Sequence, residues 1–221
     1  SNTCFAFTAE HYTNESRLSS GKWVKIRISE SGVHAITQSD ISKWGFSDIS
    51  KIKIFGYGGA PISETLTAEN YIDDLPLVPV IRANNKIYFY AQGHITWQDG
   101  KKVPFSQTQH PYANAAYYFV TENSEIPDAE LSQSEKQQTN SNNIVDTFTD
   151  FTFHESELVS TSETGRQLLG EDFKYKSTQS FKFSIPGYVN DTQISVLTAF
   201  AANTEGGDPC YLTFKYNGTQ L

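Results

Sequence analysis

The sequence predicts an all-β protein with two β-sandwich- or barrel-like domains and one short helix in the first domain. Three observations support this fold class. Apolar and polar residues alternate with period two along several short segments, which is the pattern of half-buried strands. Turns rich in glycine and proline separate these segments. Aromatic residues, which strands favour, make up 14% of the 221 residues.

The first predicted strand covers 23–28, where every second residue is apolar and the residues between them are charged. Successive side chains of a strand point to opposite faces, so one face of this strand is buried and the other is solvated. A turn at 30–32 leads into a second strand at 33–37. We expect these two strands to pair as a hairpin.

One short helix is predicted after the second strand. Thr37 or Ser39 can cap its N-terminus, and Gly45 can end it. Ile41 and Trp44 are three residues apart, so they share one face of the helix. The same period-two alternation then predicts more strands in this domain, at 51–55, 77–81, 86–90, 95–98 and 116–121.

The stretch 123–143 is rich in Ser, Gln, Asn and Glu and nearly free of aromatic residues. Such a segment buries too little apolar surface to offset the entropy of ordering it. We therefore predict a polar linker at 123–145, which separates a first domain at 18–122 from a second at 146–221. Residues 1–17 are expected to be an N-terminal extension or a signal-peptide remnant.

The second domain has few predicted strands, so we expect it to be truncated and the natural chain to continue. The sequence holds no Met, and the chain is expected to be a processed product or an excised piece. The predicted strands are 180–185, 194–201 and 211–216.

Charge and the length of apolar runs argue against nucleic-acid binding and against a membrane span. The chain has 17 Lys and Arg against 25 Asp and Glu, for a net charge of −8. A surface that binds nucleic acid needs clustered Lys and Arg, so nucleic acid is not an expected partner. No apolar run reaches the roughly 18 residues that a membrane helix needs, so no membrane span is expected.

The two cysteines, Cys4 and Cys210, allow one disulfide or none. Two free thiols are the favoured interpretation, because a bridge needs an oxidising compartment. Two cysteines with scattered histidines do not make a structural zinc site. Neither cysteine carries a nucleophile signature, and no two histidines lie close in the sequence. We therefore expect no catalytic residue, no cofactor and no metal ion in this chain.

A glycine cluster and a group of acidic residues could each form a binding site, but a simpler explanation is favoured for both. The cluster Gly56-Tyr57-Gly58-Gly59 follows a strand but lacks the Lys and Ser or Thr of a phosphate-binding loop. A tight turn that needs positive φ is favoured there. The acidic residues Asp73 and Asp74, with Asp99 and Glu64, fit no EF-hand spacing. A solvated loop is favoured for them over a calcium site.

An aromatic-dense region supplies the candidate interaction surface, formed by Trp97, Tyr112, Tyr117 and Tyr118. Exposed aromatic rings bind sugars and peptides, and strands also use aromatic residues for packing alone. Packing is the favoured interpretation, and docking is the functional alternative.

Several short motifs occur in the same order as in a known family. The chain resembles the PorU-type sortases of type IX secretion, a branch of the gingipain-type cysteine peptidase family. In the first domain the motifs lie at 18–26, 30–34, 51–59, 73–76, 87–93 and 117–121. In the second they lie at 154–159, 162–166 and 170–171.

The resemblance implies that the parent protein is a large exported cysteine peptidase at the outer membrane of a Gram-negative Bacteroidetes bacterium. In that family the catalytic Cys–His dyad lies in a domain downstream of the region matched here. His154 and Arg166 match the family pattern within its non-catalytic β region. The implied function is a non-catalytic N-terminal β region that supports its own downstream peptidase domain. It would also dock secretion-system outer-membrane components or cargo.

Two alternatives stay open. One is a stand-alone cell-surface module that binds carbohydrate or peptide through its aromatic residues. The other is a propeptide-like segment that inhibits the downstream peptidase.

Overall fold

The computed structural model describes residues 9–67, 70–99, 105–129, 131, 144, 146–160, 168–202 and 208–220. The chain divides into two compact units, Ser1–Phe151 and Thr152–Leu221. Each unit is described by itself.

The first sheet of the first unit has three antiparallel strands. They are β1 (Val24–Ile28), β8 (Ala116–Glu122) and β3 (Ile52–Phe55), in the order β1-β8-β3. β8 is central, since it pairs with β1 on one side and with β3 on the other. Its neighbours are distant in the sequence, so this sheet depends on long-range pairing.

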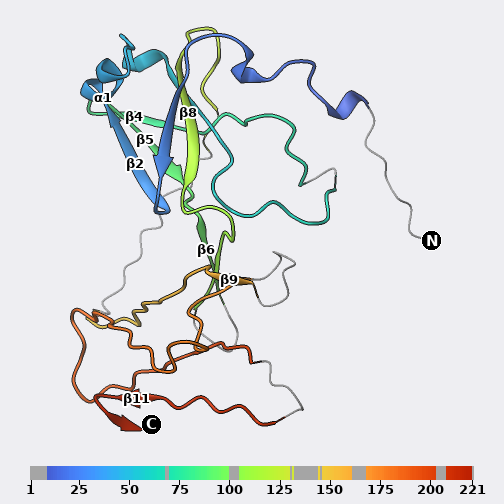
Figure 1. The fold of residues 1–221 in the computed structure, drawn as a ribbon. Helices are drawn as coiled ribbons and strands as arrows, with labels where there is room; N and C mark the ends of the chain where they lie inside the picture. The colour runs from blue at the N-terminus through green and yellow to red at the C-terminus, as the bar shows by residue number, and fades with distance from the viewer. Residues whose placement is uncertain are drawn as a thin grey trace. The chain divides into compact units, whose positions relative to one another are not determined.

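The second sheet also has three antiparallel strands, β2 (Gly32–Thr37), β5 (Lys86–Ala91) and β4 (Ile81–Ala83), in the order β2-β5-β4. β4 and β5 form a hairpin, and both residues of its turn, Asn84 and Asn85, have positive φ. That geometry is typical of the two-residue turns that match strand twist. Figure 1 shows the three strands side by side, with α1 (Gln38–Lys43) after the end of β2.

Of the two predicted N-cap residues, Thr37 and Ser39, Thr37 caps α1. Its hydroxyl accepts a hydrogen bond from the N–H of Asp40, and the Asp40 carboxylate accepts one from the N–H of Thr37. This reciprocal pair is a capping box. The hydrogen bonds from Thr37 also lower the pKa of Asp40. Within the helix, Ile41 is fully buried. Gly45 follows the helix with a φ of +76°.

The remaining elements of the first unit are short. β6 (Ile95–Asp99) and β7 (Phe105–Gln109) form an antiparallel pair. Among the described residues, the single-turn 3-10 helices η1 (Ala9–His11) and η2 (Arg17–Ser19) precede β1, and η3 (Ile49–Lys51) lies between α1 and β3.

The inner faces of the two three-stranded sheets share one hydrophobic core, to which α1 also contributes. Burial of these apolar side chains is the main favourable term for the fold. The two sheets therefore pack face to face. The buried residues of this core are Ile28, Ile36, Ile41, Phe46, Ile52, Ile54, Ile87, Phe89, Ala91, Ala116, Tyr118 and Val120.

Tyr118 joins the two sheets at the centre of this core. It lies on β8, and its ring meets the ring of Phe89 on β5 edge to face, with centroids 5.9 Å apart. Its hydroxyl oxygen accepts a hydrogen bond of 2.9 Å from the backbone N–H of Gln92, just after β5. Only 4% of Tyr118 is exposed. One side chain thus provides both an apolar and a polar link between the sheets.

The glycine cluster after β3 fits around this tyrosine. A Cβ atom on Gly56 would lie 2.6 Å from Cδ1 of Tyr118, and one on Gly59 would lie 2.7 Å from the carbonyl oxygen of Gly93. Gly58 has a φ of +92°. The expected positive φ is confirmed. The structure adds a second reason for glycine, which is the close approach of the neighbouring chain.

The second unit pairs only in two short ladders among its described residues. One ladder joins β9 (Val159–Ser160) to β10 (Leu168–Leu169), and the other joins β11 (Lys215–Tyr216) to β12 (Thr219–Gln220). Asn217 and Gly218, both with positive φ, form the turn of the second ladder.

The predicted all-β class with one short helix is confirmed, but the predicted hairpin between the first two strands is wrong. β1 pairs with β8 and β2 pairs with β5, so the two strands belong to different sheets. Local alternation identifies a strand and its buried face. The choice of partner depends on which distant strand presents a matching face, which no local pattern records.

Other predicted strands are also corrected. The expected strand at 77–81 is reduced to an isolated bridge between Leu77 and Phe55, and β4 begins only at Ile81. No strand forms at 180–185 or 194–201, where the alternating residues have no described strand beside them. A strand needs a neighbour to satisfy its backbone groups. The predicted extents at 1–17, 18–122, 123–145 and 146–221 stay predictions, because much of the linker lies outside the described residues.

Replacing Tyr118 by Phe should lower the free energy of unfolding by about 1–3 kcal/mol, because the partly buried N–H of Gln92 loses its acceptor. The neighbouring Tyr117→Phe variant is the matched control, since Tyr117 is 42% exposed and should change stability by less than about 0.5 kcal/mol. Chemical denaturation of the three proteins measures both values. Equal stability of the two variants would contradict the linking role of Tyr118.

Candidate interaction surface

Tyr118 does not belong to the predicted interaction surface, and that assignment is wrong. The alternation of β8 sends Tyr118 into the core and Tyr117 to the opposite face. Adjacent residues of a strand cannot both lie on one face, so the two tyrosines have different roles.

The other three predicted residues are exposed and come from three different elements. Trp97 on β6 is 39% exposed, and its ring centroid lies 4.4 Å from that of Phe151. Tyr112 is 70% exposed in the loop that follows β7, and its N–H donates to Nδ1 of His110. Tyr117 lies on β8. Their use in docking stays a prediction.

The outer face of the first sheet carries two cations beside Tyr117. Lys25 and Arg27 are both exposed on β1, and Arg27 lies opposite Tyr117 in the register. The ammonium nitrogen of Lys25 lies 3.9 Å from the centroid of the Tyr117 ring, a cation–π contact. We call Lys25, Arg27 and Tyr117 the cationic strip.

Arg27 also ties the loop that holds Tyr112 to this strip. Its Nη2 donates a 3.1 Å hydrogen bond to the backbone carbonyl of Asn114. The loop between β7 and β8 is therefore fastened to β1.

The two cations of the strip have no carboxylate partner among the described residues. By contrast, Lys43 and Lys51 on the same unit are paired with Asp40 and Asp48. Lys22 and Lys86 of the same unit also have no carboxylate partner among the described residues, but in the cationic strip two such cations lie two residues apart on one strand.

The outer face of the second sheet is apolar. Val33, Tyr90 and Ile81 are 74%, 63% and 57% exposed. Val33 lies opposite Tyr90, and Ile81 lies opposite the half-buried Tyr88, so the four side chains share one face of the sheet. We call these four residues the apolar outer face.

The sequence of β5 already indicates this apolar outer face. Along β5, Tyr88 and Tyr90 alternate with the buried Ile87 and Phe89, so the strand has no polar face beyond its first residue. Strands that are apolar on both faces are typical of sheets that are covered on both sides.

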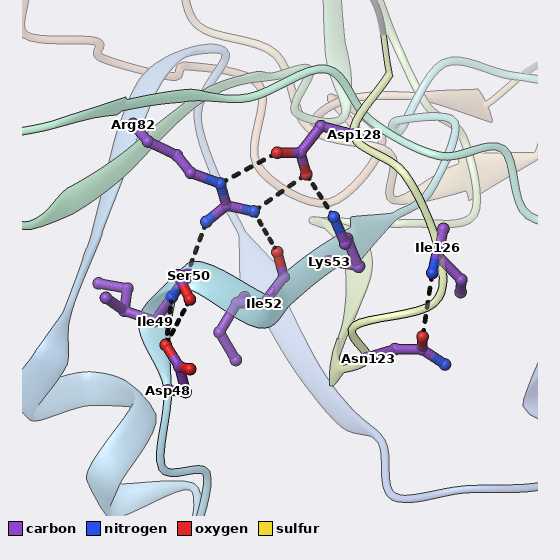
Figure 2. A network of polar contacts seen from close by, with 9 residues as sticks. All are labelled: Asp48, Ile49, Ser50, Ile52, Lys53, Arg82, Asn123, Ile126 and Asp128. Carbon is purple, nitrogen blue, oxygen red and sulfur yellow. Dashed lines mark hydrogen bonds and ion pairs between the residues drawn. The ribbon is translucent and has the colours of Figure 1, made fainter.

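A network of ion pairs around Asp128 joins the segment after β8 to the sheets of the first unit (Figure 2). The Lys53 ammonium lies 2.6 Å from Oδ1 of Asp128, and Arg82 donates to both oxygens of the same carboxylate at 3.0 and 3.1 Å. Arg82 also donates to the backbone carbonyls of Ile49 and Ile52. The network fastens the segment that follows β8 to β3 and β4, so Asp128, at the start of the predicted linker, packs on the first unit.

Asp73 and Asp74 also bind parts of their own chain. The Asp73 carboxylate accepts hydrogen bonds from the N–H of Thr13 and the hydroxyl of Tyr71. Asp74 accepts one from the N–H of Arg17, at 2.7 Å. Among the described residues, no three His, Cys, Asp or Glu side chains are grouped so that they could hold a metal ion.

The second unit contains one ring-and-carboxylate pair within the family-like motifs. Nε2 of His154 lies 2.7 Å from Oε1 of Glu171, and this hydrogen bond lowers the pKa of Glu171. The His154 ring also packs on Phe181, with centroids 4.5 Å apart. Arg166 lies outside the described residues.

Neither cysteine joins a described site. Cys210 is free and exposed, and Cys4 lies outside the described residues. In the part of the chain that the structure describes, no helix is long and apolar enough to cross a membrane.

Comparison with solved structures finds a protein that is similar to this chain. No protein-family model and no curated protein matches the chain. Among solved structures, the chain is similar to the crystal structure of dimeric latent PorU from Porphyromonas gingivalis, with 36% sequence identity and a TM-score of 0.58. The match covers 74% of this chain and 15% of the PorU chain. The chain is thus PorU-like over most of its length, as its motif order predicts.

The Asp128 network should make stability depend on acid pH. Its ion pairs, above all the hydrogen bond from Arg82, lower the pKa of Asp128 from 3.8 to about 2. A carboxyl group whose pKa is depressed on folding stabilises the fold above its unfolded pKa and loses this effect as pH falls toward its folded pKa. Asp128→Asn should therefore lower the free energy of unfolding near neutral pH, and its difference from the wild type should shrink between about pH 4 and pH 2.

Urea unfolding across this pH range measures the difference. Asp146→Asn, at an exposed position in the same unit, is the control and should stay close to the wild type throughout. A difference that does not change with pH would contradict the assignment.

Proposed function

We propose that this chain is a non-catalytic β region of a larger, exported PorU-like cysteine peptidase of the sortase type. In this proposal it supports the peptidase domain and docks partner proteins. The observation that carries the proposal is the 36% identity to PorU over 74% of this chain, together with the small share of PorU, 15%, that the chain covers. A region of that size is one part of a multidomain protein.

Catalysis then belongs to another part of the parent protein. Cys210 is exposed, and it makes no hydrogen bond with a described histidine that would activate it as a nucleophile. His154, the histidine within the family-like motifs, is instead engaged by Glu171 and Phe181.

The apolar outer face supports a role as a structural partner of other domains. Leaving Val33, Tyr90 and Ile81 in water is unfavourable, and contiguous apolar surface on a sheet marks a contact site. In the longer polypeptide, we propose, another domain covers this face. The chain would then position the peptidase domain by packing against it or against a neighbour.

The proposed location is outside the inner membrane of a Gram-negative bacterium, at the periplasmic or outer-membrane surface. The proposed partners are the chain's own downstream peptidase domain and outer-membrane components or cargo of type IX secretion. This part of the proposal rests on the similarity to PorU from P. gingivalis.

Hydroxyl-radical footprinting tests the covered face. Tyr90 should be oxidised several-fold more slowly within the full-length polypeptide than in the isolated 221-residue chain, because the added domains exclude water from it. Tyr12, 51% exposed on the N-terminal segment, is the internal reference and should react equally in both. Equal reactivity of Tyr90 in the two forms would overturn the proposal that this face supports other domains.

A further inference from the structure

We propose that the cationic strip of Lys25, Arg27 and Tyr117 binds an extended acidic polypeptide segment. The proposal gives the chemistry of one docking partner, and in that sense it rests on the proposed function. It concerns the first sheet, whereas the apolar outer face belongs to the second.

The spacing of the cations suits an extended peptide. Lys25 and Arg27 are two residues apart on one strand, so they lie on the same face, about 6.5–7 Å apart along it. In an extended acidic segment, carboxylates at every second residue recur at the same interval. Two neighbouring ion pairs can therefore form without distortion of either chain.

Both cations retain donors for a ligand. Among the described residues, Arg27 hydrogen-bonds only to Asn114, through Nη2, so the other donors of its guanidinium have no described partner and can bind a carboxylate. Lys25 is held over the Tyr117 ring and has no carboxylate neighbour among the described residues. The ring positions the ammonium without neutralising it.

Within the described residues, β1 is also an edge strand of its sheet. β1 pairs with β8 on one side, and no described strand pairs with its other side. An extended segment can add to such an edge through its main chain, while its side chains contact those of the edge strand. Cations on an edge strand can also serve only to prevent aggregation. A binding measurement separates the two roles.

The net negative charge of the chain limits where an acidic partner can bind. With 25 acidic against 17 basic residues, the chain as a whole repels an acidic partner. Binding is then favoured where two neighbouring cations have no carboxylate partner among the described residues, as at Lys25 and Arg27, and such electrostatic complementarity sets orientation more than raw affinity.

The test is fluorescence anisotropy of a labelled ten-residue peptide of alternating Glu and Thr, titrated with the 221-residue chain at low ionic strength. Lys25→Gln with Arg27→Gln should weaken binding by about tenfold or more. Lys43→Gln with Lys51→Gln removes the same charge from exposed, ion-paired positions of the same unit, and should change affinity less than about twofold. Binding should also weaken as salt is added.

Tyr117→Leu provides a second variant that keeps both charges, and it should weaken binding by a smaller factor than the double charge variant. Thermal unfolding checks that each variant is folded. If the Arg27 substitution unfolds the chain, Lys25→Gln alone should still weaken binding and reduce its salt dependence. The proposal is overturned if the wild type does not bind the peptide, or if both double variants lose affinity equally. Binding to phosphatidylglycerol vesicles but not to the peptide would assign the strip to a membrane surface instead.

Discussion

The first unit depends on the contact that Tyr118 makes between its two sheets. The ring packs against Phe89, and the hydroxyl accepts a hydrogen bond from the chain just after β5. Gly56 and Gly59 leave room for this arrangement, because a side chain at either position would collide with Tyr118 or with the segment that follows β5. With Tyr118 turned inward, the pleat of β8 turns Tyr117 outward. The packing of the core thereby fixes which side chains can form the exposed cationic strip.

Local patterns predicted the elements of this unit better than their partners. Alternation located β1, β5 and β8 to within a residue or two, and the Thr37 cap located α1. Pairing could not be read in the same way, since β8 finds β1 and β3 across long stretches of sequence. Period two along β8 is enough to place Tyr117 and Tyr118 on opposite faces, so only one of them can belong to an exposed surface.

The candidate surfaces differ in how far sequence could reveal them. The polar face of β1 is visible in the sequence as Lys25 and Arg27, but whether a carboxylate pairs with them depends on the folded chain, where none of the described carboxylates does. The apolar outer face carried a signal in the two-sided apolar pattern of β5. No local sequence pattern predicts the ion pairs of Asp128, since they join a residue from a polar stretch to cations on two distant strands.

The most direct test of the central claim is the size of the natural protein that contains this chain. An antibody raised against the 221-residue chain would capture it, and mass spectrometry of its peptides would map its extent. We expect a polypeptide several times longer than this chain, with peptides from a cysteine peptidase domain. A natural protein no longer than the chain itself would contradict a scaffold role within a PorU-like peptidase, and would leave a small binding protein in its place.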